Sequence, residues 1–237
     1  MTYQCAVRTH VGCRRTSNED AVLARPELGV WAVADGMGGH EAGEVASAMV
    51  VEALGGLDPG LTVAARTNAA TRALHQTNQA LIQLAAEKGG GRSIGSTVVA
   101  FFADGRAFIC LWAGDSRAYR ARGHSLEQLT RDHSLVQELV DLGELDPAAA
   151  ANHPNANVIT RAVGASPSLE IDSVGGDVAP GDAFLLASDG LTRLLTDAEL
   201  LAGLQAADLE PAADEMLQMC LERGAPDNVS LVLVRRA

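Results

Sequence analysis

Residues 97–115, TVVAFFADGRAFICLWAGD, contain two short apolar runs separated by Ala103-Asp104-Gly105. Runs of this length, rich in β-branched and aromatic residues, predict buried strands, and the Asp-Gly pair between them predicts a hairpin. A second hairpin is predicted where residues 117–121, RAYRA, are followed by Arg122-Gly123-His124. Further strand-like runs lie at Gly29–Ala34, Ala183–Ala187 and Val229–Val234. Neighbouring strands are therefore expected to be antiparallel.

Helical periodicity occurs in pairs of segments between the runs of strands. The predicted helices are Ala42–Leu54, Thr62–Lys88, Asp197–Ala206 and Pro211–Arg223. The third opens on Thr196 with Glu199 three residues later, which is the pattern of a capping box. Paired helices, in place of a strict alternation of strand and helix, indicate an α+β architecture with strands layered between helices.

The pattern weakens between Arg131 and Gly164, where only a short helix at Ser134–Leu142 is predicted. We call residues 131–164 the flap segment. Its low apolar content predicts a mobile segment on the surface. Because no repeat and no linker composition divides the chain, residues 1–237 are expected to form a single domain.

Composition and charge exclude several classes of partner. The chain has 237 residues, of which 47% are hydrophobic and 3% aromatic, and its formal net charge is −12. An acidic chain with few aromatic side chains is unsuited to binding nucleic acid. The four cysteines form no CxxC pair, the N-terminus lacks the apolar core of a signal peptide, and no apolar run approaches membrane-spanning length. We therefore expect buried thiols and a cytoplasmic protein without membrane or nucleic-acid partners.

Four classes of site are disfavoured because their motifs need residues at spacings that this sequence does not have. A cysteine phosphatase needs Arg six residues after the nucleophile, and none of the four cysteines has it. Residues 114–118, GDSRA, resemble a nucleophile elbow, but they end in Ala and precede a strand. The glycine loop at residues 36–41, GMGGHE, completes neither a GxGxxG nor a P-loop pattern, and its His-Glu pair does not continue into HExxH.

Acidic residues at the ends of predicted strands remain as the chemical signal. They occur at Asn18-Glu19-Asp20, Asp35-Gly36, Gly114-Asp115, Asp189-Gly190 and Asp227-Asn228. Taken singly, an Asp-Gly pair is usually a turn, Glu19-Asp20 fits a helix cap, and Asp227-Asn228 fits a plain loop. If the strand ends meet at one edge, however, the carboxylates need a cation between them. An all-oxygen set favours Mg²⁺ or Mn²⁺ over Zn²⁺.

Seven ordered motifs support this interpretation and span nearly the whole chain. They are residues 15–20 (RTSNED), 33–40 (VADGMGGH), 95–97 (GST), 114–117 (GDSR), 129–134 (LTRDHS), 187–191 (ASDGL) and 227–230 (DNVS). In this order and spacing they resemble the metal-dependent type 2C serine/threonine protein phosphatases, bacterial branch. The resemblance implies a four-layer α/β/β/α sandwich, with two antiparallel sheets flanked by pairs of helices.

The resemblance also implies a role for each matching position. Asp35 bridges two metal ions, and the other ligands are the Gly36 carbonyl, Asp20, Asp189 and Asp227. Asp115, with Asp189, matches the position that supports a third, weaker ion. Glu19 and Asn228 match positions that contact the metal ligands but not the ions themselves. Alternatively, Glu19 binds a water molecule in the site. Arg15 matches the arginine that binds the substrate phosphate, a role suited to the two-pronged guanidinium group.

The implied reaction needs no nucleophilic side chain. A hydroxide shared by two Mn²⁺ or Mg²⁺ ions attacks the phosphorus of phosphoserine or phosphothreonine, with no covalent intermediate. Eukaryotic relatives have a histidine directly after the Asp-Gly pair, whereas this chain has Met37. The proton donor is therefore open between His40, acting through water, and a metal-bound water; His40 equally fits a role in fixing its loop.

The flap segment corresponds by position to a substrate-selecting element. Ser134 and Asp132 are candidates for steering substrate or the third ion, although Asp132 also fits a cap on the helix that starts near Ser134. His153 is similarly ambiguous. Expected partners are phosphorylated proteins, in particular a serine/threonine kinase and its substrates, and the expected state is a monomer.

Two alternative functions follow from the same residues. One is a catalytically silent phosphoprotein-binding module on the same fold, although none of the expected ligands is missing from the chain. The other is a calcium-binding structural protein, which is disfavoured because the acidic residues are scattered and do not fall within one twelve-residue loop.

Overall fold

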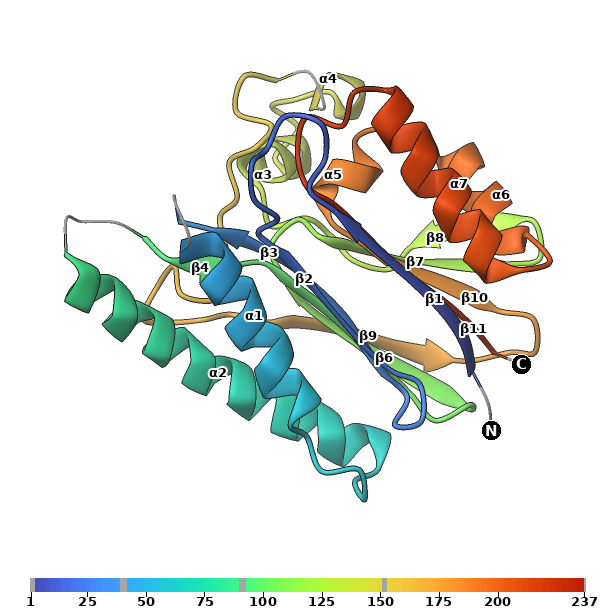
Figure 1. Cartoon of the computed structure of the whole chain (residues 1–237), viewed down its shortest axis with the longest axis horizontal. Coiled ribbons are helices and arrows are strands. Elements are labelled where there is room, and N and C mark those ends of the chain that lie inside the picture. Colours follow the sequence, from blue (N-terminus) through green and yellow to red (C-terminus); the bar gives the residue numbers. More distant parts are fainter. Residues whose placement is uncertain (1–2, 39–41, 90–92, 151–152, 237) are drawn as a thin grey trace.

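Two antiparallel sheets stacked face to face, each with helices on its outer side, form the body of the molecule (Figure 1). The computed structural model describes residues 3–38, 42–89, 93–150 and 153–236. The layer order is helices, sheet, sheet, helices, so the predicted four-layer α+β sandwich is confirmed. None of the helices in these described ranges is long and apolar enough to cross a membrane.

The first sheet has five strands. In spatial order they are β1 (Tyr3–His10), β11 (Val229–Arg236), β10 (Ala183–Ala187), β7 (Arg117–Arg122) and β8 (Ser125–Gln128). The helices on its outer face are α6 (Asp197–Gln205) and α7 (Leu209–Glu222), and the one-turn helix α5 (Asp189–Thr192) follows β10 directly. The predicted capping box at the start of α6 is present, with Thr196 as its N-cap.

The second sheet has six strands. In spatial order they are β2 (Asp20–Arg25), β3 (Val30–Met37), β5 (Val98–Ala103), β6 (Ala107–Ala113) and β9 (Asp172–Asp177), with β4 (Gly95–Ser96) beside the end of β3. The helices α1 (Ala42–Gly55) and α2 (Val63–Lys88) cover its outer face. Both predicted hairpins, β5–β6 and β7–β8, are confirmed as antiparallel pairs.

Side-chain alternation along the strands builds three apolar layers. In β3, Val30, Ala32 and Ala34 face α1 and α2, while Trp31 and Val33 face the other sheet. This is the period of two expected for a strand buried on both faces. Between the sheets the aromatic rings meet, and the centroids of Phe101 and Phe184 lie 4.5 Å apart. A third layer joins β10 and β11 to α6 and α7.

The edge strands β1 and β9 are elements that sequence patterns did not predict. Within the described part of the chain, β1 pairs only with β11, and β9 pairs only with β6. Their sequences, YQCAVRTH and DSVGGD, carry too few apolar residues to resemble buried strands. Asn18-Glu19-Asp20 follows the first strand, β1, as predicted, and Asp20 is also the first residue of β2. The expectation of buried thiols holds for Cys110 and Cys220 but is wrong for Cys13, which is exposed.

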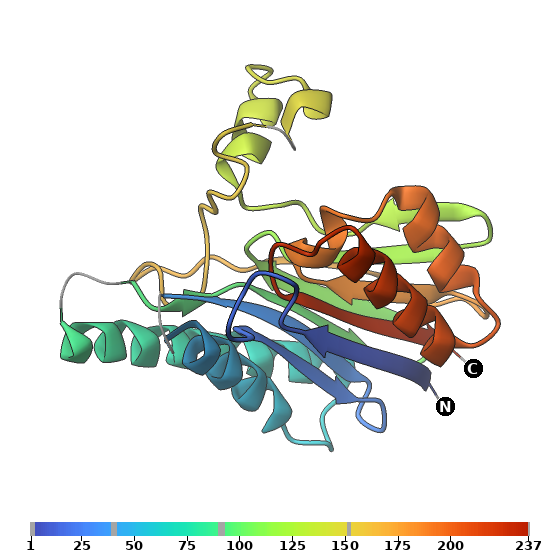
Figure 2. The same cartoon turned by 45° about the horizontal axis from the view of Figure 1, so that its top comes forward.

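The flap segment connects β8 to β9 and contains α3 (Leu135–Asp141) and α4 (Pro147–Ala150). Figure 2 shows these two short helices standing away from the stacked sheets. The helix predicted at Ser134–Leu142 is confirmed, with Ser134 as its N-cap. Leu142 is 72% exposed, which agrees with the surface position predicted from the composition of the flap segment.

Candidate active site

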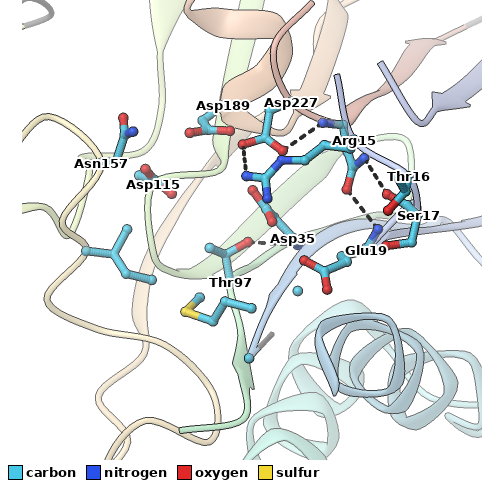
Figure 3. A pocket seen from close by; sticks show the side chains of 15 residues that line it. Arg15, Thr16, Ser17, Glu19, Asp35, Thr97, Asp115, Asn157, Asp189 and Asp227 are labelled. Carbon is cyan, nitrogen blue, oxygen red and sulfur yellow. Dashed lines mark hydrogen bonds and ion pairs between the residues drawn. The ribbon is translucent and has the colours of Figure 1, made fainter. Parts of the chain in front are cut away.

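Acidic side chains from both sheets converge on one cavity. Antiparallel register places Asp20 of β2 directly opposite Asp35 of β3. The cavity has a volume of about 480 Å³, and Figure 3 shows Asp35, Asp115, Asp189 and Asp227 around it. Like charges directly opposite one another destabilise a strand pair. The register alone therefore creates a demand for a compensating cation.

Hydrogen bonds from Thr97, the residue between β4 and β5, hold Asp35 in place. The Asp35 amide donates to the Thr97 hydroxyl at 3.0 Å, and the Thr97 amide donates to the Asp35 carbonyl at 2.8 Å. The next residue, Gly36, lies so close to the start of α1 that an added Cβ would stand 2.0 Å from the Gly43 carbonyl oxygen. Only glycine fits there, which explains the Asp-Gly pair at this strand end.

Asp20 is anchored by a different network. The Ser188 hydroxyl donates to Asp20 Oδ2 at 2.8 Å, and the Ser230 amide donates to the Ser188 hydroxyl at 3.0 Å. The other carboxylate oxygen, Asp20 Oδ1, is buried and has no hydrogen-bond partner among the described residues. A buried oxygen without a partner is energetically costly, so this atom points to a ligand that the protein does not itself provide.

Asn228 ties together two loops that border the cavity. Its side-chain oxygen accepts from the Glu19 amide at 2.8 Å, and its side-chain nitrogen donates to the Ser17 carbonyl at 3.0 Å. These bonds fix the loop that presents Arg15 against the start of β11. Glu19 itself lines the cavity beside Asp35.

Burial and mutual repulsion raise the pKa of the clustered carboxyl groups. Burial is the main cause, and it brings the pKa of Asp20 and of Asp115 to about 7, with the neighbouring carboxylates adding to it. The pKa of Asp35 lies well above its ordinary value for the same two reasons. Burial also raises the pKa of Asp189, although the adjacent Arg193 opposes the shift. Such groups favour a bound cation, because it stabilises their ionised form.

The donor set fits hard divalent ions. The oxygens available are carboxylates and the Gly36 carbonyl, which suit Mg²⁺ or Mn²⁺. Across the described ranges, however, no three His, Cys, Asp or Glu side chains are gathered tightly enough to form a ready-made metal group. The carboxylates instead surround the cavity, which leaves space between them for ions together with bridging water molecules.

Two arginines already contact these carboxylates. Arg15 reaches into the cavity and its Nη2 donates to Asp227 Oδ2 at 2.8 Å, while half of its side chain stays exposed (Figure 3). Arg193 Nε lies 2.9 Å from Asp189 Oδ2, and Arg193 Nη2 lies 3.6 Å from Asp115 Oδ2. Sequence reasoning selected Arg15 but missed Arg193. The available signal was its position four residues after Asp189, which places both side chains on one side of a helical turn.

Sequence reasoning also missed His133, which holds the backbone next to Asp115. The Gly114 amide donates to His133 Nδ1 at 3.2 Å, so Nε2 carries the proton and faces Asp172 Oδ2 at 3.1 Å. His133 also stacks against Trp112, with the ring planes 15° apart. Because Gly114 immediately precedes Asp115, this network fixes the backbone that presents the carboxylate.

The remaining candidates from the sequence are Ser134, Asp132 and His40. Ser134 accepts from the Gln137 amide as the cap of α3, and it borders a second cavity, of about 400 Å³, that shares Asp115 and Asp189 with the first. The proposed capping role of Asp132 was wrong, because its carboxylate pairs with Arg117 at 2.7 Å. His40 lies outside the described residues.

The four-layer architecture and its cavity of buried carboxylates are those that the resemblance to metal-dependent type 2C phosphatases implies. Comparison with known proteins identifies the family. The chain belongs to the protein phosphatase 2C family, whose model matches residues 13–233.

Curated bacterial relatives carry the same assignment. The chain is 37% identical over 231 residues to the serine/threonine protein phosphatase PstP of Mycobacterium tuberculosis, and the match covers 96% of this chain and 44% of PstP. The chain therefore spans less than half the length of this relative. It is 33% identical to the serine/threonine phosphatase stp of Listeria monocytogenes, where the match covers 97% of this chain and 94% of the relative.

Solved structures agree over the whole fold. PppA, described as a key regulatory component of T6SS in Pseudomonas aeruginosa, has a TM-score of 0.92 and 43% identity, covering 99% of this chain and 98% of that chain. The catalytic domain of PstP in complex with two manganese ions has a TM-score of 0.86 and 35% identity, with 99% and 98% coverage.

Proposed function

We propose that this chain is a protein serine/threonine phosphatase that depends on Mn²⁺ or Mg²⁺. The observation that carries the proposal is the facing pair Asp20 and Asp35, whose carboxyl groups have raised pKa values. Asp35 lines the cavity that Arg15 enters, and Asp20 lies directly opposite Asp35 in the neighbouring strand. Relatives named as serine/threonine phosphatases support the same activity. The substrates are phosphorylated proteins, and hydrolysis proceeds by direct attack of water, without a covalent enzyme intermediate.

The proposal places two ions in the core of the cavity and a third, weaker one at its rim. The PstP structure with two manganese ions supports this number for the core. The proposed ligands are Asp20, Asp35, the Gly36 carbonyl, Asp189 and Asp227 for the core, with Asp115 and Asp189 for the rim. Such ions, when bound, act as Lewis acids and lower the pKa of a water molecule so that it becomes nucleophilic at neutral pH.

Side chains of the protein orient the substrate and the ligands. Arg15 can present two N–H groups to two phosphate oxygens, and its contact with Asp227 holds the guanidinium group at the cavity wall. Thr97 fixes Asp35, and Glu19 is placed to accept a hydrogen bond from a water molecule in the same cavity. A proton must also reach the leaving seryl or threonyl oxygen, and donation by His40 through water remains a proposal.

The flap segment borders the cavity through Asn157 and Ile159. This position supports a role in substrate selection, with Ser134 as a candidate substrate contact at the neighbouring cavity. We further propose that residues 1–237 act as one domain with a mobile flap segment. We also propose that the protein is a cytoplasmic monomer, and that its partners include a serine/threonine kinase and the substrates of that kinase.

Phosphate release from a phosphothreonine peptide tests the activity. Metal-depleted protein should release inorganic phosphate only after Mn²⁺ is added, and Asp35→Asn should abolish release. Asp104→Asn is the matched control, because Asp104 accepts backbone hydrogen bonds in the β5–β6 turn and does not line the cavity. Turnover that persists in chelator, or an active Asp35→Asn variant, would contradict the proposal. Peptide binding without phosphate release would instead support a silent binding module.

A further inference from the structure

Arg193 joins the cavity carboxylates to the flap segment. It follows the one-turn helix α5 as its C-cap, and 37% of its side chain is exposed. On one side the guanidinium group lies 2.9 Å from Asp189 and 3.6 Å from Asp115. Both carboxylates are buried or nearly so, whereas most surface ion pairs are open to water.

The other side of the same guanidinium group contacts the flap segment. Arg193 Nη2 donates to the Ala156 carbonyl at 3.0 Å, and Nη1 donates to the side-chain oxygen of Asn157. Ala156 and Asn157 belong to consecutive turns closed by hydrogen bonds from Ala156 to His153 and from Val158 to Asn155. One side chain therefore connects this part of the flap segment to α5.

The contacts of Arg193 conflict with a metal ion at the rim. A guanidinium group and a divalent cation both require the lone pairs of Asp115 and Asp189. If both contacted the same carboxylates, their positive charges would also repel each other. We propose that Arg193 is a built-in cation that occupies the Asp115–Asp189 pair when the third ion is absent, and that it docks the flap segment in that state. Binding of the third ion displaces Arg193 and releases residues 156–157.

This inference rests on the proposed metal-dependent function and adds a coupling to it. The third ion and the docked flap segment are mutually exclusive, so each reduces the population of the other. A simple structural role is the competing explanation, in which Arg193 only closes α5 through its (i, i+4) contact with Asp189. That role predicts a loss of stability without a change in metal affinity.

The test uses Arg193→Met, which keeps the length of the side chain but removes its charge. Arg25→Met is the matched control, because Arg25 has a similar exposed fraction of 43% and pairs with Glu27 at the opposite end of β2 from Asp20. Calorimetric titration of metal-depleted protein with Mn²⁺ measures the affinity of each site. Hydrogen exchange followed by mass spectrometry measures the protection of residues 153–160.

In Arg193→Met, we expect the dissociation constant of the weakest Mn²⁺ site to fall at least tenfold, while the control keeps the wild-type value. Residues 153–160 should exchange faster in Arg193→Met without metal. In the wild type they should exchange faster only when Mn²⁺ fills the weakest site. Arg193→Lys keeps the charge but loses the two-pronged contact with residues 156–157, so its exchange should increase and its weak-site affinity should rise, but by less than in Arg193→Met.

Two results would overturn the inference. One is a wild-type Mn²⁺ affinity in Arg193→Met, and the other is exchange of residues 153–160 that does not respond to Mn²⁺ in the wild type. If Arg193→Met fails to fold, Asn157→Ala removes a flap contact alone and should still speed exchange and tighten the weak site; unchanged values again refute the coupling. A wild type that neither binds Mn²⁺ nor releases phosphate would refute the proposed function itself, which keeps the two failures distinguishable.

Discussion

Replacing Asp20 by Asn should remove one contribution to the pH dependence of stability in the metal-free protein, so that the variant is less stable than wild type at low pH and more stable at high pH. The folded pKa of Asp20 is about 7, mainly because of burial, against an ordinary value of 3.8. Below pH 4 this carboxyl is protonated in both the folded and unfolded states. Between pH 4 and pH 7 the unfolded chain loses the proton and the folded chain keeps it, so the free energy of unfolding falls as pH rises. About three pH units at about 1.4 kcal/mol each set an upper limit of about 4 kcal/mol by pH 8.

Asn cannot titrate, so Asp20→Asn escapes this loss. It introduces a different cost, because its amide nitrogen takes the place of an oxygen that has no partner among the described residues, a penalty of about 1–3 kcal/mol. In chelator, the variant should therefore be less stable than wild type at pH 4.5 and more stable by about 1–3 kcal/mol at pH 8. Each kcal/mol corresponds to about 2–4 °C in Tm for a chain of this size.

Thermal unfolding followed by circular dichroism across this pH range measures the difference. Adding Mn²⁺ at pH 8 supplies the internal control, since wild type should gain about 2.7 kcal/mol at a concentration of 100 times Kd, while Asp20→Asn gains much less. Curves of Tm against pH that run parallel for the two proteins would refute the assignment of a strained, ionisable carboxyl at this position.

Three further predictions concern substrate, backbone and metal. Arg15→Ala should lower kcat/KM for a phosphothreonine peptide by roughly 10–100-fold, mainly through KM, because it removes charge-assisted phosphate binding; a pure fall in kcat would argue against that role. Gly190→Ala should lower Tm by several degrees and remove activity, because the added Cβ would stand 1.9 Å from the Asn228 carbonyl oxygen. Gly55→Ala is the control and should fold normally, because its Cβ would lie 3.4 Å from the Leu23 side chain. Chelation should abolish phosphate release reversibly, and Mn²⁺ that fails to restore it would contradict a metal requirement.

Interior strands could be predicted from sequence because both of their faces are buried. The run at residues 98–103, VVAFFA, is buried at every position, so its composition alone identifies a strand. The edge strand β9, DSVGGD, alternates between exposed and half-buried positions and contains two glycines. Its strand conformation depends on pairing with β6, which no local pattern reveals.

In the candidate site, too, some residues could be predicted from local sequence and others could not. Asp35 and Asp189 each stand beside a glycine that close backbone contacts require, so their local sequence carries a signal. Arg193 shows only the spacing of four residues from Asp189, and nothing local indicates its contact with Asn157, 36 residues away along the chain. His133 has no local signal, because its partner Asp172 lies 39 residues away. Such contacts arise only when the flap segment and β9 are placed against the body.

The central claim is that carboxylates from separate strands gather divalent ions in one cavity. Crystals soaked in Mn²⁺ and measured at the manganese absorption edge test it most directly. Two strong anomalous peaks among Asp20, Asp35, Asp189 and Asp227 are the predicted result. The absence of any peak between these side chains, in crystals that bind Mn²⁺ elsewhere, would contradict the claim.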